Sequence, residues 1–218
     1  MLLARCDLVL VGTQNPENLG GVARLAENFA PASLALVAPR AQPDDPRALV
    51  VGRMARERLA AARVVATLDE AVREAACVVG FSARRGAQRP AVALRELAAR
   101  VPAGRIALVF GPEDAGLSAE DVERCDLVAT IDVPGALPSL NLTQAVAIAL
   151  WELAREADAA PSARAAASRE ELEALIERVP GIDERAKVHL RRLLVGAGLE
   201  PADVRALHGW LRALDRSW

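Results

Sequence analysis

Three loops of the sequence gather the side chains that could do chemistry. The first runs from Asn15 to Arg24 and joins an apolar run, residues 7–12, to a segment with helical spacing. At such a loop the free backbone N–H groups and the helix dipole favour an anion, and the adjacent Gly20 and Gly21 allow a phosphate or another backbone to approach closely. Loops with Asn and Gly are also common as plain structure, so this loop alone does not define a site.

The other two loops carry carboxylates, a hydroxyl and an amide. The segment Phe-Gly-Pro-Glu-Asp-Ala-Gly-Leu follows a buried strand and places Glu113 and Asp114 where open α/β sheets bind ligands. Residues 133–146, rich in Pro and Gly at their start, bring Ser139 and Asn141 to the beginning of a long apolar helix. Each loop has a structural alternative, which is turn geometry for the second and N-capping by Ser139 for the third.

The residue inventory excludes several kinds of chemistry. The strand-to-helix loop lacks the G-x-G-x-x-G fingerprint and no G-K-[ST] phosphate loop occurs, which argues against a dinucleotide-dependent dehydrogenase. Tyr is absent, and the two histidines, His189 and His208, lie far from the three loops, so we expect no metal site and no Ser-His hydrolase. Three cysteines without C-x-x-C spacing predict reduced, packed thiols: Cys6, Cys77 and Cys125.

The loops are positioned by alternating strands and helices. Short apolar runs typical of buried strands occur at residues 7–12, 34–38, 64–67, 77–82, 106–111 and 127–133. Helical segments separate them, including residues 47–61, and the strongest helix is expected at 140–157. This alternation predicts an α/β fold with a parallel sheet covered by helices on both faces.

A change in composition divides the chain. We predict a main domain over residues 1–157, a linker rich in small residues over 158–168, and a helical C-terminal extension over 169–218. Ser168 followed by Glu171 is a capping-box signature that begins the extension. Three helices in about 50 residues are too few to be comfortable alone, so we expect them to pack on the main domain or on a partner copy.

Charge is distributed unevenly although the formal net charge is only −2. Residues 1–105 hold 15 arginines against 10 acidic residues, and residues 106–218 hold 12 basic against 19 acidic residues. The arginines cluster at Arg53, Arg56, Arg58 and Arg63 and again at Arg84, Arg85 and Arg89. Such clusters are either ordinary solvated surface or a patch that faces an RNA backbone. With no apolar run long enough to span a bilayer and no signal-like N-terminus, the chain is predicted to be soluble and cytoplasmic.

The order and combination of the three loops resemble a known family. Asn-x-Gly-x-x-Ala-Arg, then Phe-Gly-x-Glu-x-x-Gly-Leu, then Ser-Leu-Asn-x-x-x-Ala-Val are similar to the three motifs of the SpoU/TrmH family of RNA 2′-O-ribose methyltransferases, in the SPOUT class. The resemblance runs from about Leu8 to Leu153. The segment 78–86 and the helical tail are similar to the TrmJ branch, which methylates the first nucleotide of tRNA anticodon loops.

The resemblance implies a fold and a reaction. The expected fold is a parallel sheet whose C-terminal segment forms a deep trefoil knot, which pattern reading alone would not propose. The expected reaction moves a methyl group from S-adenosylmethionine to a ribose 2′-hydroxyl of tRNA, on a homodimer, without a metal and without a membrane. Methylation of rRNA or of another tRNA site, and a non-catalytic RNA-binding knot protein, are the alternatives.

The resemblance also assigns residues. Donor contacts are expected at Phe81, Ser82, Ala83, Gly111, Ile131, Pro138, Ser139 and Leu140. Arg24 would hold the ribose and its neighbouring phosphate, as an electrostatic and positioning group because a guanidinium is not deprotonated in proteins. Asn18 would hold the Arg24 loop, Glu113 would orient it, and Ser139 and Asn141 would bind ribose or donor. Phe81 and Pro138 depart from the branch, which usually carries hydroxyl side chains there.

Overall fold

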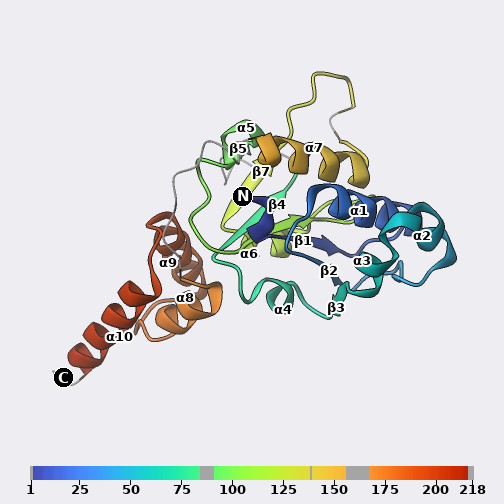
Figure 1. The fold of residues 1–218 in the computed structure, drawn as a ribbon. Helices are drawn as coiled ribbons and strands as arrows, with labels where there is room; N and C mark the ends of the chain where they lie inside the picture. Colours follow the sequence, from blue (N-terminus) through green and yellow to red (C-terminus); the bar gives the residue numbers. More distant parts are fainter. Residues whose placement is uncertain (1, 84–90, 138, 156–166, 216–218) are drawn as a thin grey trace.

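The computed structural model describes residues 2–83, 91–137, 139–155 and 167–215, and its core is a parallel sheet (Figure 1). The seven strands lie in the order β3-β2-β1-β6-β4-β7-β5, and every pair of neighbours is parallel. Their bounds are β1 Cys6–Val11, β2 Ser33–Val37, β3 Arg63–Val65, β4 Cys77–Phe81, β5 Val92–Ala93, β6 Ile106–Phe110 and β7 Leu127–Thr130. The predicted α/β class is therefore confirmed, while the trefoil knot stays a prediction from the family.

Two details of the strands differ from the prediction. The two-residue strand β5 was not predicted, because so short a segment has no recognisable period. The last predicted strand, 127–133, ends at Thr130 instead. Pro134 and Gly135 follow closely, and a proline cannot donate a backbone hydrogen bond to a neighbouring strand.

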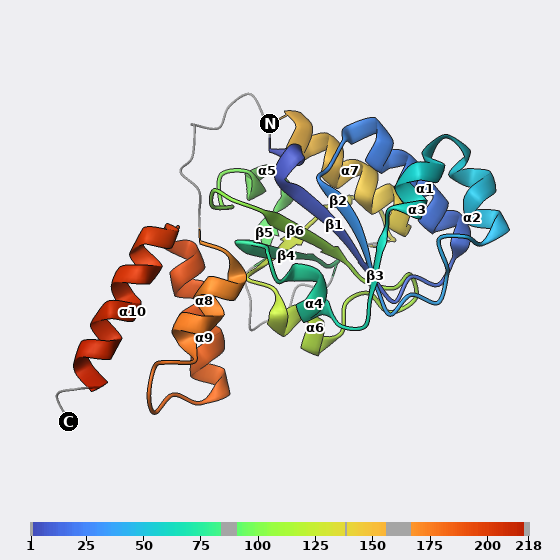
Figure 2. The ribbon, with the colours of Figure 1, turned by 60° about the horizontal axis from the view of Figure 1, so that its bottom comes forward.

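Helices cover both faces of the sheet (Figures 1 and 2). Helices α1 Pro16–Phe29, α5 Leu94–Leu97 and α7 Leu142–Arg155 lie on one face, and α4 Leu68–Val72 and α6 Ala119–Arg124 lie on the other. Strand residues alternate between the two layers: Leu8 and Leu10 belong to the core beneath α1 and α7, and Val9 belongs to the core beneath α4. The β4, β6 and β7 strands are buried in this double cover, and their C-terminal ends remain available for a site.

The segment 47–61, predicted to be helical, is helical but interrupted. The segment forms α2 Pro46–Val51, a 3₁₀ turn η2 Arg53–Ala55 and α3 Arg56–Ala60, with a break at Gly52. The break coincides with a close approach to α1, since a Cβ on Gly20 would lie 2.3 Å from the Ala48 carbonyl oxygen and 2.9 Å from the Gly52 nitrogen. Two glycines thus allow backbone to pack on backbone here.

Three C-terminal helices, α8 Arg169–Ile176, α9 Glu184–Gly196 and α10 Pro201–Asp215, lie at the opposite end of the molecule from α2 and α3 (Figures 1 and 2). The predicted capping box of Ser168 and Glu171 is confirmed. Most of the predicted linker, residues 158–166, lies outside the described residues. Leu172 and Leu175 of α8 are buried in the same apolar core as α1 and α7, so the extension packs on its own main domain.

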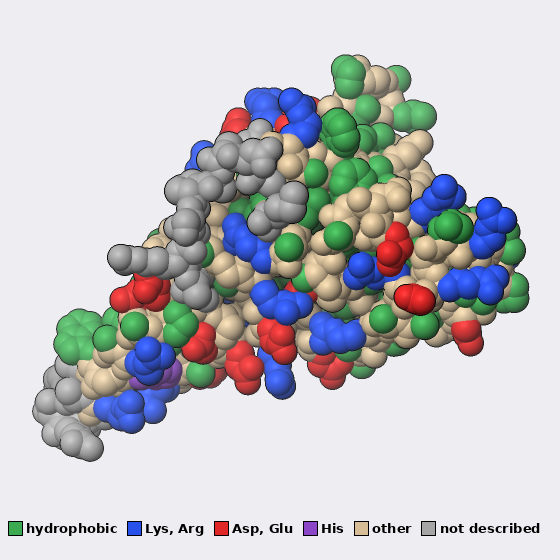
Figure 3. Space-filling model, viewed as in Figure 1, with side chains coloured by type: hydrophobic (Ala, Val, Ile, Leu, Met, Phe, Trp, Pro, Cys, Tyr) green, Lys and Arg blue, Asp and Glu red, His purple; other side chains and the backbone are tan. Residues whose placement is uncertain are grey.

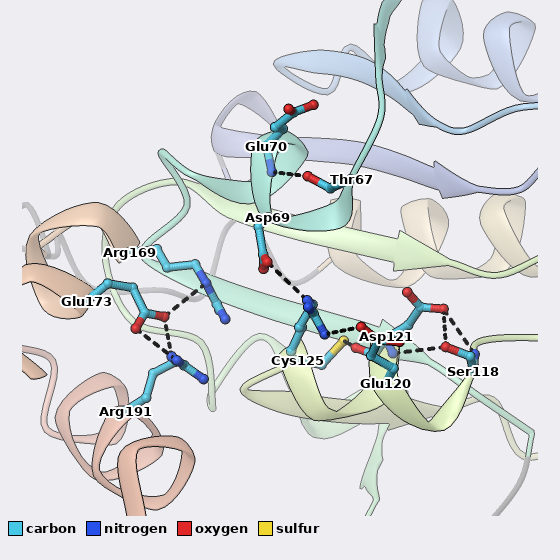
Figure 4. Close-up of polar contacts among 11 residues, drawn as sticks. Thr67, Asp69, Glu70, Ser118, Glu120, Asp121, Cys125, Arg169, Glu173 and Arg191 are labelled. Carbon is cyan, nitrogen blue, oxygen red and sulfur yellow. Dashed lines mark hydrogen bonds and ion pairs between the residues drawn. The ribbon is translucent and has the colours of Figure 1, made fainter. Parts of the chain in front are cut away.

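The junction between the extension and the sheet is polar as well as apolar. The Arg169 backbone N–H donates to the Ala75 carbonyl at 2.6 Å, and the Arg169 guanidinium pairs with Asp126 at 3.3 Å, with both side chains buried. Glu173 pairs with both Arg169 and Arg191, which ties α8 to α9 (Figure 4). These contacts lie before the N-terminal ends of β4 and β7.

The three cysteines are free and buried, as predicted. Burial raises the pKa of the Cys6 thiol to about 12 and raises that of Cys77 well above its ordinary value. Among the helices of the described residues, none is long and apolar enough to cross a membrane.

Candidate functional site

A cavity of about 380 Å³ lies where β4, β6 and β7 end. Its walls come from the residues that follow these strands and from the first turn of α7. It is lined by Phe81, Ser82, Ala83, Phe110, Gly111, Pro112, Glu113, Asp114, Ala115, Gly116, Leu117, Ala129, Ile131, Ser139, Leu140, Leu142 and Ala145. The carboxyl ends of parallel strands are where open α/β sheets bind ligands.

The residues predicted to contact a methyl donor come together at this cavity. Seven of the eight line it, and Pro138 lies outside the described residues. They come from three separate stretches of chain, which begin at or just after the C-terminal ends of β4, β6 and β7. Their role in binding stays a prediction, but their convergence on one cavity is a property of the fold.

Phe81 has a structural explanation that the sequence did not provide. It pairs with Phe110 on the neighbouring strand, and the two rings stack with centroids 4.3 Å apart and planes inclined by 9°. Both rings line the cavity. Phe81 therefore presents an apolar, polarisable surface to the cavity. The resemblance to the family had indicated only the loss of a hydroxyl at this position.

The loop after β6 is folded too tightly for any residue but glycine at its start. A Cβ on Gly111 would lie 2.2 Å from the Leu117 nitrogen and 2.3 Å from the Gly116 carbonyl carbon. Gly116 itself has a φ of +66°, in the left-handed region that favours glycine. The close turn places the backbone of residues 111–117 along one side of the cavity.

A chain of side-chain hydrogen bonds joins the three predicted loops. The Asn18 amide nitrogen donates to Glu113 Oε1 at 2.9 Å, and the Asn141 amide nitrogen donates to Asn18 Oδ1 at 3.1 Å. Glu113 also accepts the backbone N–H groups of Gln14, at 3.0 Å, and Asn15, at 3.2 Å. Asn18, buried in α1, is thus the junction of the first loop with the second and the third.

These bonds keep Glu113 ionised. Burial acts to raise the pKa of Glu113, but hydrogen bonds from Asn18 and from the backbone N–H groups of Gln14 and Asn15 together outweigh it and lower the pKa. A carboxylate that already accepts three hydrogen bonds is a poor proton acceptor. The geometry therefore supports the positioning roles predicted for Glu113 and Asn18.

Asn141, rather than Ser139, caps α7. The Asn141 Oδ1 accepts the Thr143 backbone N–H at 2.9 Å, in the Asx geometry of a helix N-terminus. Ser139 lies in the preceding loop, exposed, and lines the cavity. The hydroxyl is thus left available to a ligand, while Asn141 is held by Asn18 and by its own helix.

Arg24 is exposed on α1 and does not line the cavity of its own chain. It follows Gly20 by four residues and Gly21 by three, so it shares a side of the helix with both. Gly20 faces the backbone of α2 at Ala48, and Gly21 faces the Thr143 side chain of α7. Arg24 therefore projects to solvent between α2 and α7, and the structure does not bring it together with Ser139.

Sequence reasoning missed several residues of the cavity wall. Phe110, Leu117, Ala129, Leu142 and Ala145 line the cavity without having been predicted. Ala145 follows Asn141 by four residues in α7, so helical spacing from Asn141 could have indicated it. Among the described residues, no group of three or more His, Cys, Asp or Glu side chains is placed to hold a metal ion.

Comparison with known proteins places this geometry in a family. Residues 5–151 match the SpoU rRNA Methylase family. The chain is 35% identical over 223 residues to tRNA (cytidine/uridine/adenosine-2′-O-)-methyltransferase TrmJ of Pseudomonas aeruginosa, an alignment that covers 98% of this chain and 86% of that protein.

Solved structures agree. The crystal structure of TrmJ from Z. mobilis is 32% identical, with a TM-score of 0.77, and the match covers 96% of this chain and 98% of that one. A structure described as giving insights into the 2-OH methylation of C/U34 on tRNA is 31% identical, with a TM-score of 0.60. That match covers 97% of that chain but 71% of this one. The chain belongs to the SpoU rRNA methylase family.

Proposed function

We propose that this chain transfers a methyl group from S-adenosylmethionine to a ribose 2′-hydroxyl of tRNA, at the first nucleotide of the anticodon loop. The observation that carries the proposal is the cavity at the ends of β4, β6 and β7, in whose wall the second and third loops meet. Hydrogen bonds of Asn18 with Glu113 and Asn141 join the first loop to both of them. The P. aeruginosa relative, similar over nearly the whole chain, is named as a tRNA 2′-O-methyltransferase. We place the reaction in the cytoplasm, in keeping with the free, buried thiols.

The cavity fits the methyl donor chemically. Ile131, Leu140 and the Phe81 ring offer apolar surface to an adenine, and its volume lies within the range of small-molecule sites. Glu113 and Asp114 lie in its wall, and hydrogen bonds lower the pKa of each, so both carry negative charge at neutral pH. That charge favours a cationic ligand. When bound, S-adenosylmethionine supplies a methyl group on a positively charged sulfonium.

The protein's contribution is position and charge. Methyl transfer is an in-line displacement, so holding the ribose 2′-oxygen in line with the methyl group lowers much of the barrier. Arg24 is permanently charged and would hold the ribose and its neighbouring phosphate, while the 2′-hydroxyl proton leaves to phosphate or water. Ser139, exposed at the cavity, would contact ribose or donor.

The site is shared between two chains of a homodimer in this proposal. Arg24 lies outside the cavity of its own chain, so it would serve the cavity of a partner. Two large apolar side chains are exposed on α7: Trp151 is 59% exposed and Ile148 40%. A two-fold contact through this face would cover them and bring each Arg24 toward the partner's Ser139 loop.

The reaction is tested by incubating the protein with labelled S-adenosylmethionine and total tRNA, followed by nucleoside mapping. Label on the ribose of the first anticodon-loop nucleotide supports the proposal. Label at position 34 would instead favour the methylation of C/U34 that the description of the 31% identical structure names. That match covers only 71% of this chain. Calorimetry without added metal should show one donor bound per chain, and absence of heat and of thermal stabilisation would exclude donor binding.

The shared site is tested by complementation. Arg24→Ala and Asn141→Ala are prepared separately, checked for folding and inactivity, and mixed so that subunits exchange. A mixed dimer then has one site without both groups and one intact site, so activity should return to about one quarter of wild type under random pairing. No recovery after verified exchange would place Arg24 in the site of its own chain.

A further inference from the structure

The arginine-rich segment after Asp45 is not explained by the cavity. Residues 46–63 hold five arginines and one glutamate, in a chain whose net charge is −2. The segment forms α2, η2 and α3, which lie beside α1 at the end of the molecule away from the C-terminal helices (Figure 1). An arginine that already forms a hydrogen bond or an ion pair within the protein is less available to a ligand.

Three of the five arginines have partners within the protein. Arg47 contacts the Asp45 carboxylate that caps α2. Arg58 pairs with Glu27 of α1 at 3.1 Å, and Arg63 donates to the Ala71 carbonyl at 2.9 Å. Arg58 and Arg63 therefore fasten the segment to its surroundings, while Arg47 makes a local contact at the start of α2.

Arg53 and Arg56 differ from these three. Neither guanidinium forms a hydrogen bond or an ion pair with any residue that the structure describes, and both side chains are exposed. Two large apolar side chains accompany them on the surface: Val50 is 74% exposed and Met54 71%. We call these four residues the η2 surface. Figure 3 shows Lys and Arg side chains next to hydrophobic ones at this end of the molecule.

The η2 surface is held rigidly. Ala55 and Leu59 are each 1% exposed and anchor the inner side of η2 and α3 in the core. The backbone of Gly52 lies against Gly20 of α1, as the 2.9 Å approach of a Gly20 Cβ to the Gly52 nitrogen shows. The backbone that carries Arg53 and Arg56 is therefore fixed relative to α1, the helix that carries Asn18 and Arg24.

We propose that the η2 surface binds the phosphate backbone of the RNA substrate beyond the target nucleotide. The inference rests on the proposed function and extends it. Two exposed guanidiniums that have no partner among the described residues lie on a rigid backbone beside the helix of Arg24. They provide the local positive field that a polyanion needs, whatever the net charge of the chain. Val50 and Met54 offer apolar contact to sugars or to unstacked bases of a single-stranded loop.

A second copy of the chain is a less suitable occupant. A two-fold contact through the η2 surface would place the Arg53 and Arg56 pairs of both copies together, and like charges brought together in an interface oppose association. An RNA backbone supplies the opposite charge. If a second copy of the chain occupied the η2 surface, substitutions there would change the oligomeric state; if RNA occupies it, they would not.

The experiment compares tRNA affinity of the full-length protein with that of Arg53→Ala/Arg56→Ala over a range of salt. If each arginine contacts one phosphate, the variant binds about 15- to 30-fold more weakly at 0.15 M salt and about threefold more weakly at 0.5 M, and its salt slope falls by about 1.4 to 1.8. Donor affinity, measured by calorimetry, gives a check that the cavity is intact. Arg95→Ala/Arg100→Ala, which removes two exposed arginines at and just after α5, is the control for the loss of two positive charges and should bind as wild type does. Arg95 differs from the η2 arginines in its exposed ion pair with Glu96, at 3.6 Å.

The outcomes are separable. If the wild type methylates tRNA and the η2 variant keeps its affinity and salt slope, the η2 surface is not an RNA site, although the proposed function stands. Equal losses in the η2 variant and in the control would mean that overall charge, not this surface, is responsible. If Val50→Ser/Met54→Ser converts a dimer to a monomer, the surface is an interface between copies. If the wild type methylates no RNA, the proposed function fails and this inference with it.

Discussion

Asn18 is the most informative single position in the site, because one substitution there changes one hydrogen bond. Its Oδ1 accepts from Asn141, and its amide nitrogen donates to Glu113. In Asn18→Asp the acceptor remains, but the donor becomes an oxygen that faces a carboxylate. Because Glu113 is ionised and can only accept, the new contact turns from attraction into repulsion.

The magnitude follows from the 2.9 Å contact. Two unit charges at that separation repel by about 1.4 kcal/mol in water and about 6 kcal/mol at an effective dielectric constant of 20. Glu113 is exposed, so we take about 3 kcal/mol, which lowers the melting temperature by about 6 to 12 °C in a protein of this size. Asn18→Ala removes both bonds without adding charge and should cost about 1 to 3 kcal/mol.

The dependence on pH distinguishes repulsion from simple loss of a bond. In Asn18→Asp the two carboxylates repel each other, which raises the pKa of one of them above its value in the unfolded chain. The stability that this carboxyl contributes is therefore present in acid and is lost as pH rises through its folded pKa. In the wild type the pKa of Glu113 is lowered, so its contribution is present at neutral pH and is lost as pH falls through the folded pKa. The gap between the two proteins should therefore narrow from pH 7.5 to pH 5.

Thermal unfolding by circular dichroism at the two pH values measures this gap. Hydrogen exchange of the Gln14 and Asn15 amides, which bond to Glu113, shows whether the loop opens first. Asn18→Ala serves as the control and should show a deficit that depends little on pH. A melting temperature of Asn18→Asp equal to that of wild type at pH 7.5, or a deficit that does not change with pH, would refute the proposed junction.

Two further predictions concern the cavity loop and the thiols. Gly111→Ala should abolish donor binding measured by calorimetry, because its Cβ would lie 2.2 Å from the Leu117 nitrogen. The control Gly135→Ala, with open space around its Cβ, should bind the donor as wild type does. Equal donor affinities of the two variants would contradict the tight turn at Gly111. Alkylation of Cys6 by iodoacetamide at pH 8 should proceed at the rate of unfolding, because the thiol is buried with a pKa of about 12, and fast labelling of folded protein would show the packing to be wrong.

The placement of the site could be predicted from sequence because parallel strands impose it. Each of the second and third motifs directly follows a predicted strand, and the carboxyl ends of parallel strands meet at one edge. The resemblance to the family implied donor contacts at Ser82, Gly111 and Ile131, and the structure brings all three to one cavity. No side-chain geometry was needed for that step.

What could not be predicted depends on contacts between distant residues. The break at Gly52 follows from its approach to Gly20, and neither residue signals it within its own segment. The stacking of Phe81 on Phe110 requires the order of strands β4 and β6 in the sheet. Arg24 shows a different limit: its motif was recognisable, but only the fold shows that it does not line the cavity of its own chain.

The docking of the C-terminal helices has a consequence for function that can be tested at Arg169. Its guanidinium pairs with Asp126 in a buried contact between residues 43 positions apart in sequence. Burial raises the pKa of Asp126, and the positive charge of Arg169 opposes that rise. Arg169→Met leaves the carboxylate without its cation and should cost about 3 to 5 kcal/mol, while adding Asp126→Asn should restore part of the loss.

Donor binding should survive Arg169→Met at temperatures where the variant is folded. Asp126 immediately precedes β7 and Ile131 follows it, so the contact and the cavity are separated by the length of the strand, roughly 16 Å for five extended residues. Calorimetry of the variant and of the double variant measures the donor affinity beside the melting temperature. A large loss of affinity in folded Arg169→Met would show that docking of the extension is transmitted along β7 to the cavity. Unchanged affinity would mean that the Arg169–Asp126 contact stabilises the fold without acting on the donor cavity.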